Sequence, residues 1–159
     1  MKITIREARV EDIDTINELT DQMHRFLADL YELELTMDEL EEEHFEDEIR
    51  GVYVAEGIGG GVVGYMSFAR GRSEWAGPYY EIEHIAVRED HRGLGAGRML
   101  FETLLKKAKK ERVNITTGTL ARNERALSFY EGLGFKKLSV GLLLDLQNRI
   151  EEKGLEDIL

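Results

Sequence analysis

A strand that leads through a glycine-rich turn directly into a helix is the feature that most limits how this chain can fold. Residues 79–87 (YYEIEHIAV) have the aromatic and β-branched composition of a strand, and residues 96–112 carry apolar side chains at helical spacing. The turn between them, REDHRGLGAGR, contains three glycines, which permit backbone conformations that other residues disfavour. A strand and a helix that adjoin in this way predict a mixed α/β domain with a central sheet.

Further strand and helix patterns fill the rest of the chain. Apolar and polar residues predict strands over 2–8, 52–56, 62–69 and 113–119, with a last strand or strand pair within 135–146, and helices over 11–30, 36–50 and 123–133. The GIGGG turn at 57–61 predicts a hairpin. The resulting order, β-α-α-β-β-β-α-β-α-β, predicts a single domain over 1–159 that ends in a short polar tail at 147–159.

The composition excludes several classes of protein. The 159 residues include no cysteine, which removes disulfides, thiolate metal sites and cysteine nucleophiles. No apolar run approaches the ~18 residues of a membrane span, and the first residues lack the apolar stretch of a signal peptide, so we expect a cytoplasmic protein that binds no membrane. The four histidines are scattered along the sequence, and we expect no metal site. The charged fraction of 33% is as typical of a thermophilic source as of an ordinary acidic protein.

The formal net charge of −11 is unevenly distributed along the chain. Residues 1–50 contain 5 basic and 17 acidic side chains, whereas residues 88–137 contain 12 basic and 6 acidic ones. The negative total argues against binding to the backbone of a nucleic acid. The two regions predict one part of the molecule that attracts cations and another that attracts anions, with acidic helices that serve only solubility as the alternative.

The turn at 92–97 (RGLGAG) has the features of a phosphate-binding segment. Its glycines let the backbone approach a ligand, its successive N–H groups can form a concavity for anionic oxygens, and the next helix adds its positive N-terminal dipole. No Lys-Ser or Lys-Thr follows, so the turn is not a P-loop, and its surroundings are a poor match to a dinucleotide-binding fold. By itself the turn favours a phosphate cradle and simple turn chemistry equally.

Two sequence blocks together resemble the GNAT superfamily of N-acetyltransferases. The stretch IAVREDHRGLGAGRMLF resembles the family's acyl-CoA-binding signature, which is Arg or Gln, two residues, Gly, one residue, and Gly or Ala, here at Arg92, Gly95 and Gly97. The stretch NERALSFYEGLGF at 123–135 resembles the family's Asn-x-x-Ala-x-x-Phe-Tyr-x-x-x-Gly-Phe block. The spacing of the blocks and the order of elements agree with the family over nearly the whole chain.

The resemblance implies a GNAT-type acyltransferase fold and an enzyme that moves an acetyl group from acetyl-CoA to an amine by direct attack in a ternary complex. In the family the fourth and fifth strands splay apart, the pantetheine arm lies against the fourth strand, and the pyrophosphate lies on the backbone amides of the turn. Carried over by position, the cofactor-binding residues are Ile85, Ala86, Val87, Arg92, Gly93, Leu94, Gly95, Ala96, Gly97, Arg98, Asn123, Ala126 and Tyr130.

The transfer needs a proton acceptor for the amine and a proton donor for the thiolate. Strand alternation places Glu81 and Glu83 on one face of the strand 79–87 and His84 on the other. The resemblance favours Glu83 as the proton acceptor, with Glu81 as its nearest rival. A β-bulge would change this alternation, so His84 also stays a candidate. Tyr130 matches the family's tyrosine that is often assigned as the general acid, with packing of its helix on the sheet as the alternative role.

We expect the acceptor to be cationic. The first two helices of the family commonly line the acceptor side, and here they form the acidic part of the chain. A polyamine, a lysine-rich peptide and an N-terminal amine all fit this expectation, and acetyl is only the default acyl group of the family. Two other classes stay open, a CoA-binding sensor without turnover and a non-catalytic interaction module. The apolar LLLDL run is compatible with a strand at a homodimer interface.

Overall fold

The computed structural model describes residues 2–46, 49 and 51–150, and within them five strands form one sheet. The strands lie side by side in chain order, and neighbours are antiparallel except that the fifth runs parallel to the fourth. They are β1 (Thr4–Glu7), β2 (Val52–Glu56), β3 (Val62–Ser73), β4 (Gly77–Val87) and β5 (Asn114–Thr117). The helices are α1 (Ile13–Leu30), α2 (Met37–Glu41), α3 (Ala96–Glu111) and α4 (Glu124–Gly132), with 3₁₀ turns at Val10–Asp12 and Glu89–His91. No helix in these described ranges combines the length and apolar character needed to cross a membrane.

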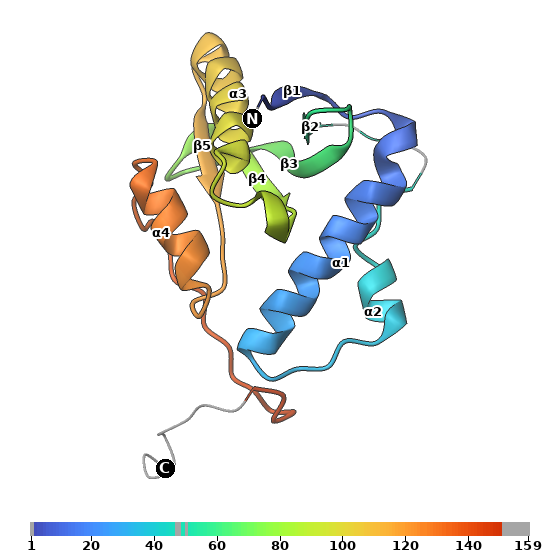
Figure 1. Cartoon of the computed structure of the whole chain (residues 1–159). Helices are drawn as coiled ribbons and strands as arrows, with labels where there is room; N and C mark the ends of the chain where they lie inside the picture. The colour runs from blue at the N-terminus through green and yellow to red at the C-terminus, as the bar shows by residue number, and fades with distance from the viewer. Residues whose placement is uncertain (1, 47–48, 50, 151–159) are drawn as a thin grey trace.

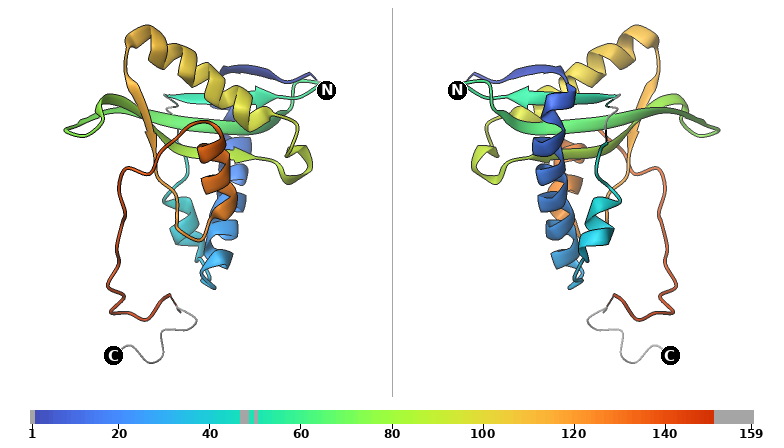
Figure 2. Two further views of the ribbon diagram at one scale, coloured as in Figure 1. Left: turned by 90° about the vertical axis from the view of Figure 1, so that its left-hand side faces the viewer. Right: turned by 90° about the vertical axis from the view of Figure 1, so that its right-hand side faces the viewer.

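Helices cover both faces of the sheet, as Figures 1 and 2 show. On one face α3 and α4 pack over a core that includes Leu100, Leu104 and Tyr130. On the other face α1 packs Ile16 against strand residues that include Tyr65. Figure 1 shows α1 and α4 on opposite sides of the end of β4. This arrangement confirms the mixed α/β fold that the order of elements predicts.

Local signals determine where α3 and α4 begin. Helix α3 starts directly after Gly95, whose φ of 89° is left-handed and favours glycine. It ends at Glu111, and the next residue, Arg112, adopts the left-handed conformation (φ 57°) usual at a helix C-terminus. Asn123 caps α4, since its side-chain oxygen accepts a hydrogen bond from the Ala126 N–H at 3.2 Å. Both starting points are therefore set by short stretches of sequence.

A β-bulge in β4 changes which side chains face which layer. The register with β3 passes directly from Ile82 to His84, which leaves Glu83 as the extra residue. Ile82 and Ile85 both pack against the core beneath α3, although strict alternation would place them on opposite faces. His84 turns toward the α1 face, where its ring meets that of Tyr65 at a centroid distance of 6.5 Å. The simple alternation predicted for this strand is therefore broken at Glu83, by the bulge that the sequence analysis kept as the alternative.

The second predicted helix is much shorter than expected. The sequence predicts a helix over 36–50, but α2 ends at Glu41. The predicted capping box is present, because Thr36 and Glu39 exchange hydrogen bonds at 2.9 and 3.2 Å. Further acidic residues then follow at 42 and 43, where their negative charge opposes the negative C-terminal end of a helix. Residues 47–48 and 50 of this prediction lie outside the described residues.

The predicted last strand is also wrong. Residues 135–146 form no strand in the described structure, although the hairpin predicted at 57–61 does form between β2 and β3. Six large apolar side chains in this stretch are exposed, and Leu142 reaches 94%. A strand needs a neighbouring strand for its backbone hydrogen bonds, so apolar composition alone does not produce one. The predicted polar tail is described only as far as residue 150.

Candidate active site

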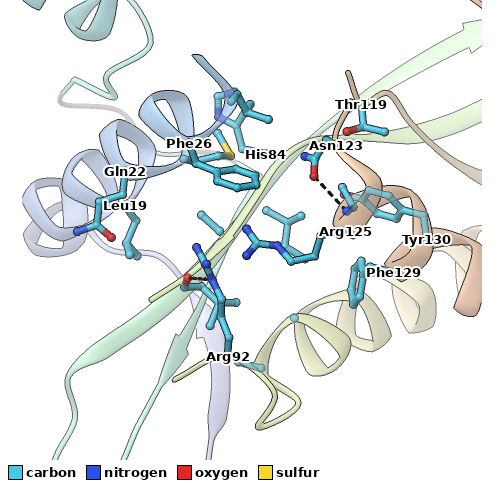
Figure 3. A pocket seen from close by; sticks show the side chains of 18 of the residues that line it. Leu19, Gln22, Phe26, His84, Arg92, Thr119, Asn123, Arg125, Phe129 and Tyr130 are labelled. Atoms are coloured by element: carbon cyan, nitrogen blue, oxygen red, sulfur yellow. Dashed lines mark hydrogen bonds between the residues drawn. The ribbon is translucent and has the colours of Figure 1, made fainter. Parts of the chain in front are cut away.

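A pocket of about 760 Å³ opens between α1, the second half of β4 and the N-terminal ends of α3 and α4 (Figure 3). Every predicted cofactor-binding residue lines this pocket except Leu94, which is 46% exposed. The structure therefore brings together the two sequence blocks that are separated along the chain. The lining consists of Leu19, Gln22, Met23, His24, Phe26, Leu27, residues 83–87, 91–93, 95–98 and 118–120, Asn123, Arg125, Ala126, Phe129 and Tyr130.

Within the part of the chain that the structure describes, one edge of β4 has no strand partner where it borders the pocket. β5 pairs with β4 only from Tyr79 to Ile82, while β3 stays paired with the other edge as far as Val87. Residues 83–87 of β4 and residues 118–120, which follow β5, both line the pocket. Backbone groups on such an edge can form hydrogen bonds with an extended ligand that carries amides. This separation of β4 from β5 agrees with the splay that the family resemblance implies.

The turn at 92–97 forms a cation-rich end of the pocket. Gly93 and Gly95 have φ angles of 76° and 89°, so the turn depends on glycine at both positions. Helix α3 starts at Ala96, and its first backbone N–H groups and its dipole favour an anion at this end. Gly97 packs under the ring of Phe129, which an added Cβ would approach to 3.5 Å.

Two arginine side chains reach into the pocket near this turn, as Figure 3 shows. Arg92 donates from Nε to the backbone oxygen of Val87 at 3.3 Å. Arg125 lies over the ring of Phe26 from α1, at 4.4 Å from the ring centroid. Burial and the nearby charge of Arg92 both lower the pKa of Arg125. Sequence reasoning missed Arg125, although its position directly before Ala126 in the second block was an available signal.

Tyr130 lies on α4 at the point where β4 and β5 separate. Its side chain is buried, with 7% exposed, and its hydroxyl lies near the side chain of Thr117. Thr117 is the last residue of β5 and donates to the backbone oxygen of Ile82 at 3.1 Å. Burial raises the pKa of Tyr130, so the phenol keeps its proton at neutral pH. A protonated phenol at this place can donate a proton into the pocket.

The three candidate proton acceptors on β4 lie in different surroundings. Glu83 and His84 line the pocket, whereas Glu81 does not and lies opposite Thr116 of β5. Glu83 is exposed at the bulge. The side chain of His84 is 20% exposed, and burial followed by the neighbouring His24 lowers its pKa. The structure thus brings Glu83 and His84 to the pocket, and their part in proton transfer stays a prediction.

Two of the four histidines meet in space, contrary to the expectation that they are scattered. The rings of His24 and His84 lie edge to face at a centroid distance of 5.4 Å. Glu43, from the segment after α2, joins them, and the ligand-type atoms of the three side chains all lie within 4.8 Å of one another. His24 of α1 and His84 of β4 both line the pocket. The pocket therefore has an anion-attracting end and a second polar cluster on its α1 side.

Comparison with known proteins agrees with this geometry. The model of the Acetyltransferase (GNAT) family matches residues 14–135 of the chain. Among curated proteins, the uncharacterized N-acetyltransferase YuaI of Bacillus subtilis (strain 168) is 33% identical over 104 residues, which cover 62% of this chain and 60% of YuaI. The match thus spans about three fifths of the length of this relative.

Solved structures with the same fold cover almost the whole chain. A tetramutant of the BH1408 protein from Bacillus halodurans superposes with a TM-score of 0.72 at 24% identity, over 89% of this chain and 99% of that one. The aminoglycoside N-acetyltransferase AAC(6')-Iy in complex with CoA superposes with a TM-score of 0.66 at 16% identity, over 92% and 95% of the two chains. At these identities the structures show the fold. Because the family model covers most of the sequence, the chain belongs to the acetyltransferase (GNAT) family.

Proposed function

We propose that this chain transfers an acetyl group from acetyl-CoA to a primary amine. The observation that carries the proposal is the unpaired edge of β4, which begins beside Tyr130 and leads to the cationic turn at 92–97. A matching ligand is extended, has amides along its middle, a diphosphate at one end and a thioester at the other. Acetyl-CoA has these features in this order.

The residues of the pocket divide the binding of acetyl-CoA between them. The backbone of residues 85–87 would pair with the amides of the pantetheine arm, and the amides of the turn at 92–97 would hold the diphosphate. Arg92 and Arg125 would neutralise the phosphate charge, and Arg98 adds a third cation at the start of α3. Asn123 and Ala126 border the arm from α4, and the small side chain of Ala126 leaves room for it.

The chemistry requires three proton transfers that this chain's own residues can serve. A basic side chain on the α1 side of the pocket takes one proton from the ammonium of the acceptor, and the free amine nitrogen then forms a bond to the acetyl carbon. When the carbon–sulfur bond breaks, the phenol of Tyr130 donates a proton to the departing thiolate and regains one from the amide nitrogen. The products are the acetylated amine, CoA with a free thiol and one proton released to solvent.

The acceptor in this proposal is cationic. The first fifty residues carry a formal charge of −12; within them, α1 lines one side of the pocket, and Glu43 lies beside the two histidines of that side. A negative field on this side attracts a protonated amine, while the opposite end attracts the phosphates of acetyl-CoA. The two substrates of the proposed enzyme would thus approach from different ends of one pocket.

Release of free thiol from acetyl-CoA tests the proposal directly. Purified protein is mixed with acetyl-CoA and one of three amines, spermidine, a lysine-rich peptide with a blocked N-terminus or a peptide with a free N-terminal alanine. We expect turnover with at least one of them and thermal stabilisation by CoA alone. Arg92→Ala should lower the rate of thiol release and the affinity for CoA about tenfold or more. The matched control is Arg88→Ala, because Arg88 is paired with Asp90 at 3.0 Å and does not line the pocket.

The outcomes separate the proposal from its alternatives. Stabilisation by CoA without thiol release with any of the three amines would indicate a CoA-binding module that does not turn over. The absence of both effects would indicate a role outside acyl-CoA chemistry, such as a non-catalytic interaction protein. Equal losses in Arg88→Ala and Arg92→Ala would show that only the overall charge of the loop matters.

A further inference from the structure

A chain of hydrogen bonds behind His84 determines which of its ring nitrogens carries a proton. The hydroxyl of Thr20 donates to the backbone oxygen of Ile16 at 2.8 Å, so its one proton is committed to this bond. The contact of 2.6 Å between the hydroxyls of Thr20 and Tyr65 must then use the proton of Tyr65. The contact of 3.4 Å between Tyr65 Oη and His84 Nδ1 is left with Nδ1 as its donor. Neutral His84 therefore carries its proton on Nδ1 and a lone pair on Nε2.

Nε2 of His84 lies close to a carboxylate, that of Glu43. His84 Nε2 lies 3.8 Å from Glu43 Oε2, and His24 stands edge to face beside it. Both histidines line the pocket, and the side chain of Glu43 is 54% exposed, so a ligand can reach the space between them. The three side chains come from α1, from the segment after α2 and from β4.

The spacing of the cluster is wide enough for an ammonium group. Acceptor atoms that surround one ammonium nitrogen at hydrogen-bond distances of about 2.9 Å lie about 4.7 Å apart. Ligand atoms that surround a tetrahedral zinc ion at about 2.1 Å lie about 3.4 Å apart. The atoms of this cluster all lie within 4.8 Å of one another, and the His84–Glu43 pair is separated by 3.8 Å. The 3.8 Å separation lies between the two values, so the spacing admits either ligand, and we consider a protonated amine because the pocket is proposed to bind one.

The surroundings keep His84 neutral and Tyr65 protonated at neutral pH. Burial, followed by the charge of His24, lowers the pKa of His84, and Glu43 opposes this shift. Burial raises the pKa of Tyr65 to about 12, so its proton stays in the hydrogen-bond chain. Asp21, another titratable residue of α1, is hydrogen-bonded to His44 at 2.6 Å and is thereby engaged elsewhere.

We propose that Glu43, His24 and His84 form the acceptor-amine subsite, in which Glu43 binds the ammonium group and His84 Nε2 takes its proton. This inference rests on the proposed acetyltransferase function and specifies its second substrate as a protonated primary amine. The ammonium loses one proton to Nε2, which yields a neutral amine and an imidazolium. The amine lone pair then forms the bond to the acetyl carbon, and the imidazolium later releases its proton to solvent. Thr20 and Tyr65 are positioning residues, because they act only through the ring of His84.

The variant His84→Asn removes Nε2 while an amide N–H can still donate to Tyr65. The test measures kcat/KM against pH for wild type and variant, with acetyl-CoA and the most active of spermidine, the blocked lysine-rich peptide and the alanine peptide. We expect the wild type to be level between about pH 7 and pH 9, because protonated amine and neutral His84 are the dominant forms there. We expect His84→Asn to lose about 100-fold at neutral pH and then to rise tenfold per pH unit, as only the neutral amine in solution reacts. Stabilisation by CoA should be unchanged.

The carboxylate is tested with Glu43→Gln, and the matched control is the neighbouring exposed residue in Glu42→Gln. We expect Glu43→Gln to raise KM for the amine about tenfold with little change in kcat, and Glu42→Gln to change neither. A wild-type pH profile in His84→Asn, or equal effects of the two glutamine variants, would overturn the subsite while the acetyltransferase activity stands. Loss of wild-type activity with a chelator, restored by zinc, would also overturn it in favour of a metal site. Failure of all three amines with the wild type would instead overturn the proposed function and the subsite together.

Discussion

Replacement of Tyr130 by phenylalanine removes one hydroxyl from the place where β4 and β5 separate. Tyr130 is only 7% exposed, and its hydroxyl lies near Thr117. Thr117 keeps its own hydrogen bond to the Ile82 oxygen at 3.1 Å, so Tyr130→Phe leaves no orphaned buried donor on that side. The variant should therefore fold normally and bind CoA as the wild type does.

The expected effect of Tyr130→Phe on catalysis is much larger than its effect on stability. Loss of one ordinary hydrogen bond costs about 1 kcal/mol, which lowers Tm by roughly 3 °C in a chain of this size. Loss of a general acid costs about 100-fold in kcat, which corresponds to about 2.7 kcal/mol of activation free energy. Burial raises the pKa of Tyr130, so the phenol can donate up to high pH, and wild-type kcat falls only as the pH rises through this pKa. We expect that alkaline limb to be absent from the variant.

The assay for Tyr130→Phe is thiol release under saturating acetyl-CoA and amine across neutral and alkaline pH, with thermal melts of the same samples. The control is Tyr80→Phe, because Tyr80 is similarly buried, with 6% exposed, but does not line the pocket and donates its hydroxyl proton to Glu111 at 2.6 Å. We expect Tyr80→Phe to lose stability and to keep kcat. If Tyr130→Phe keeps kcat within about threefold and retains the alkaline limb, the phenol is not the proton donor.

Three further predictions concern stability. In Gly64→Ala the added Cβ would lie 2.9 Å from the backbone oxygen of Ala86, so we expect a loss of about 2 kcal/mol in a denaturant melt and weaker stabilisation by CoA. The ion pair with Arg6 lowers the pKa of Asp12. The ionised carboxylate therefore stabilises the fold above its unfolded pKa of about 3.9, and this stabilisation is lost as the pH falls through the lower folded pKa. Asp12→Asn should cost about 3 kcal/mol of unfolding free energy at neutral pH and flatten the acid side of the stability profile. Ser67→Ala should leave the free energy of unfolding unchanged or raise it by up to about 1 kcal/mol, because its buried hydroxyl has no hydrogen-bond partner among the residues that the structure describes.

Each of these has a control on a comparable residue. Gly61→Ala places a Cβ where no atom lies within 4 Å and should have little effect on CoA stabilisation. Asp14→Asn changes an exposed carboxylate in the first turn of α1, two residues after Asp12, and should leave the acid side of the profile intact. A loss in Ser67→Ala as large as that in Gly64→Ala would show that the serine hydroxyl has a partner in solution.

The glycine-rich turn and its helix could be read from the sequence because their causes are local. Gly93 and Gly95 adopt left-handed φ angles that few other residues tolerate, and Asn123 caps α4 through an atom three residues away. The predicted last strand failed for the opposite reason, since a strand depends on a partner elsewhere in the chain. Arg125 was missed because its value to the pocket comes from Phe26, which lies on a different helix.

The sequence by itself determined the class of fold, the family and the segments that surround the cofactor pocket, because caps, glycine turns and apolar spacing act over a few residues. Only the tertiary structure decided which β4 side chains face the pocket. The bulge at Glu83 exists because the register with β3 skips one residue, and a register is set by hydrogen bonds between strands. That single skipped residue turns His84 toward Tyr65, His24 and Glu43, which the sequence leaves far apart.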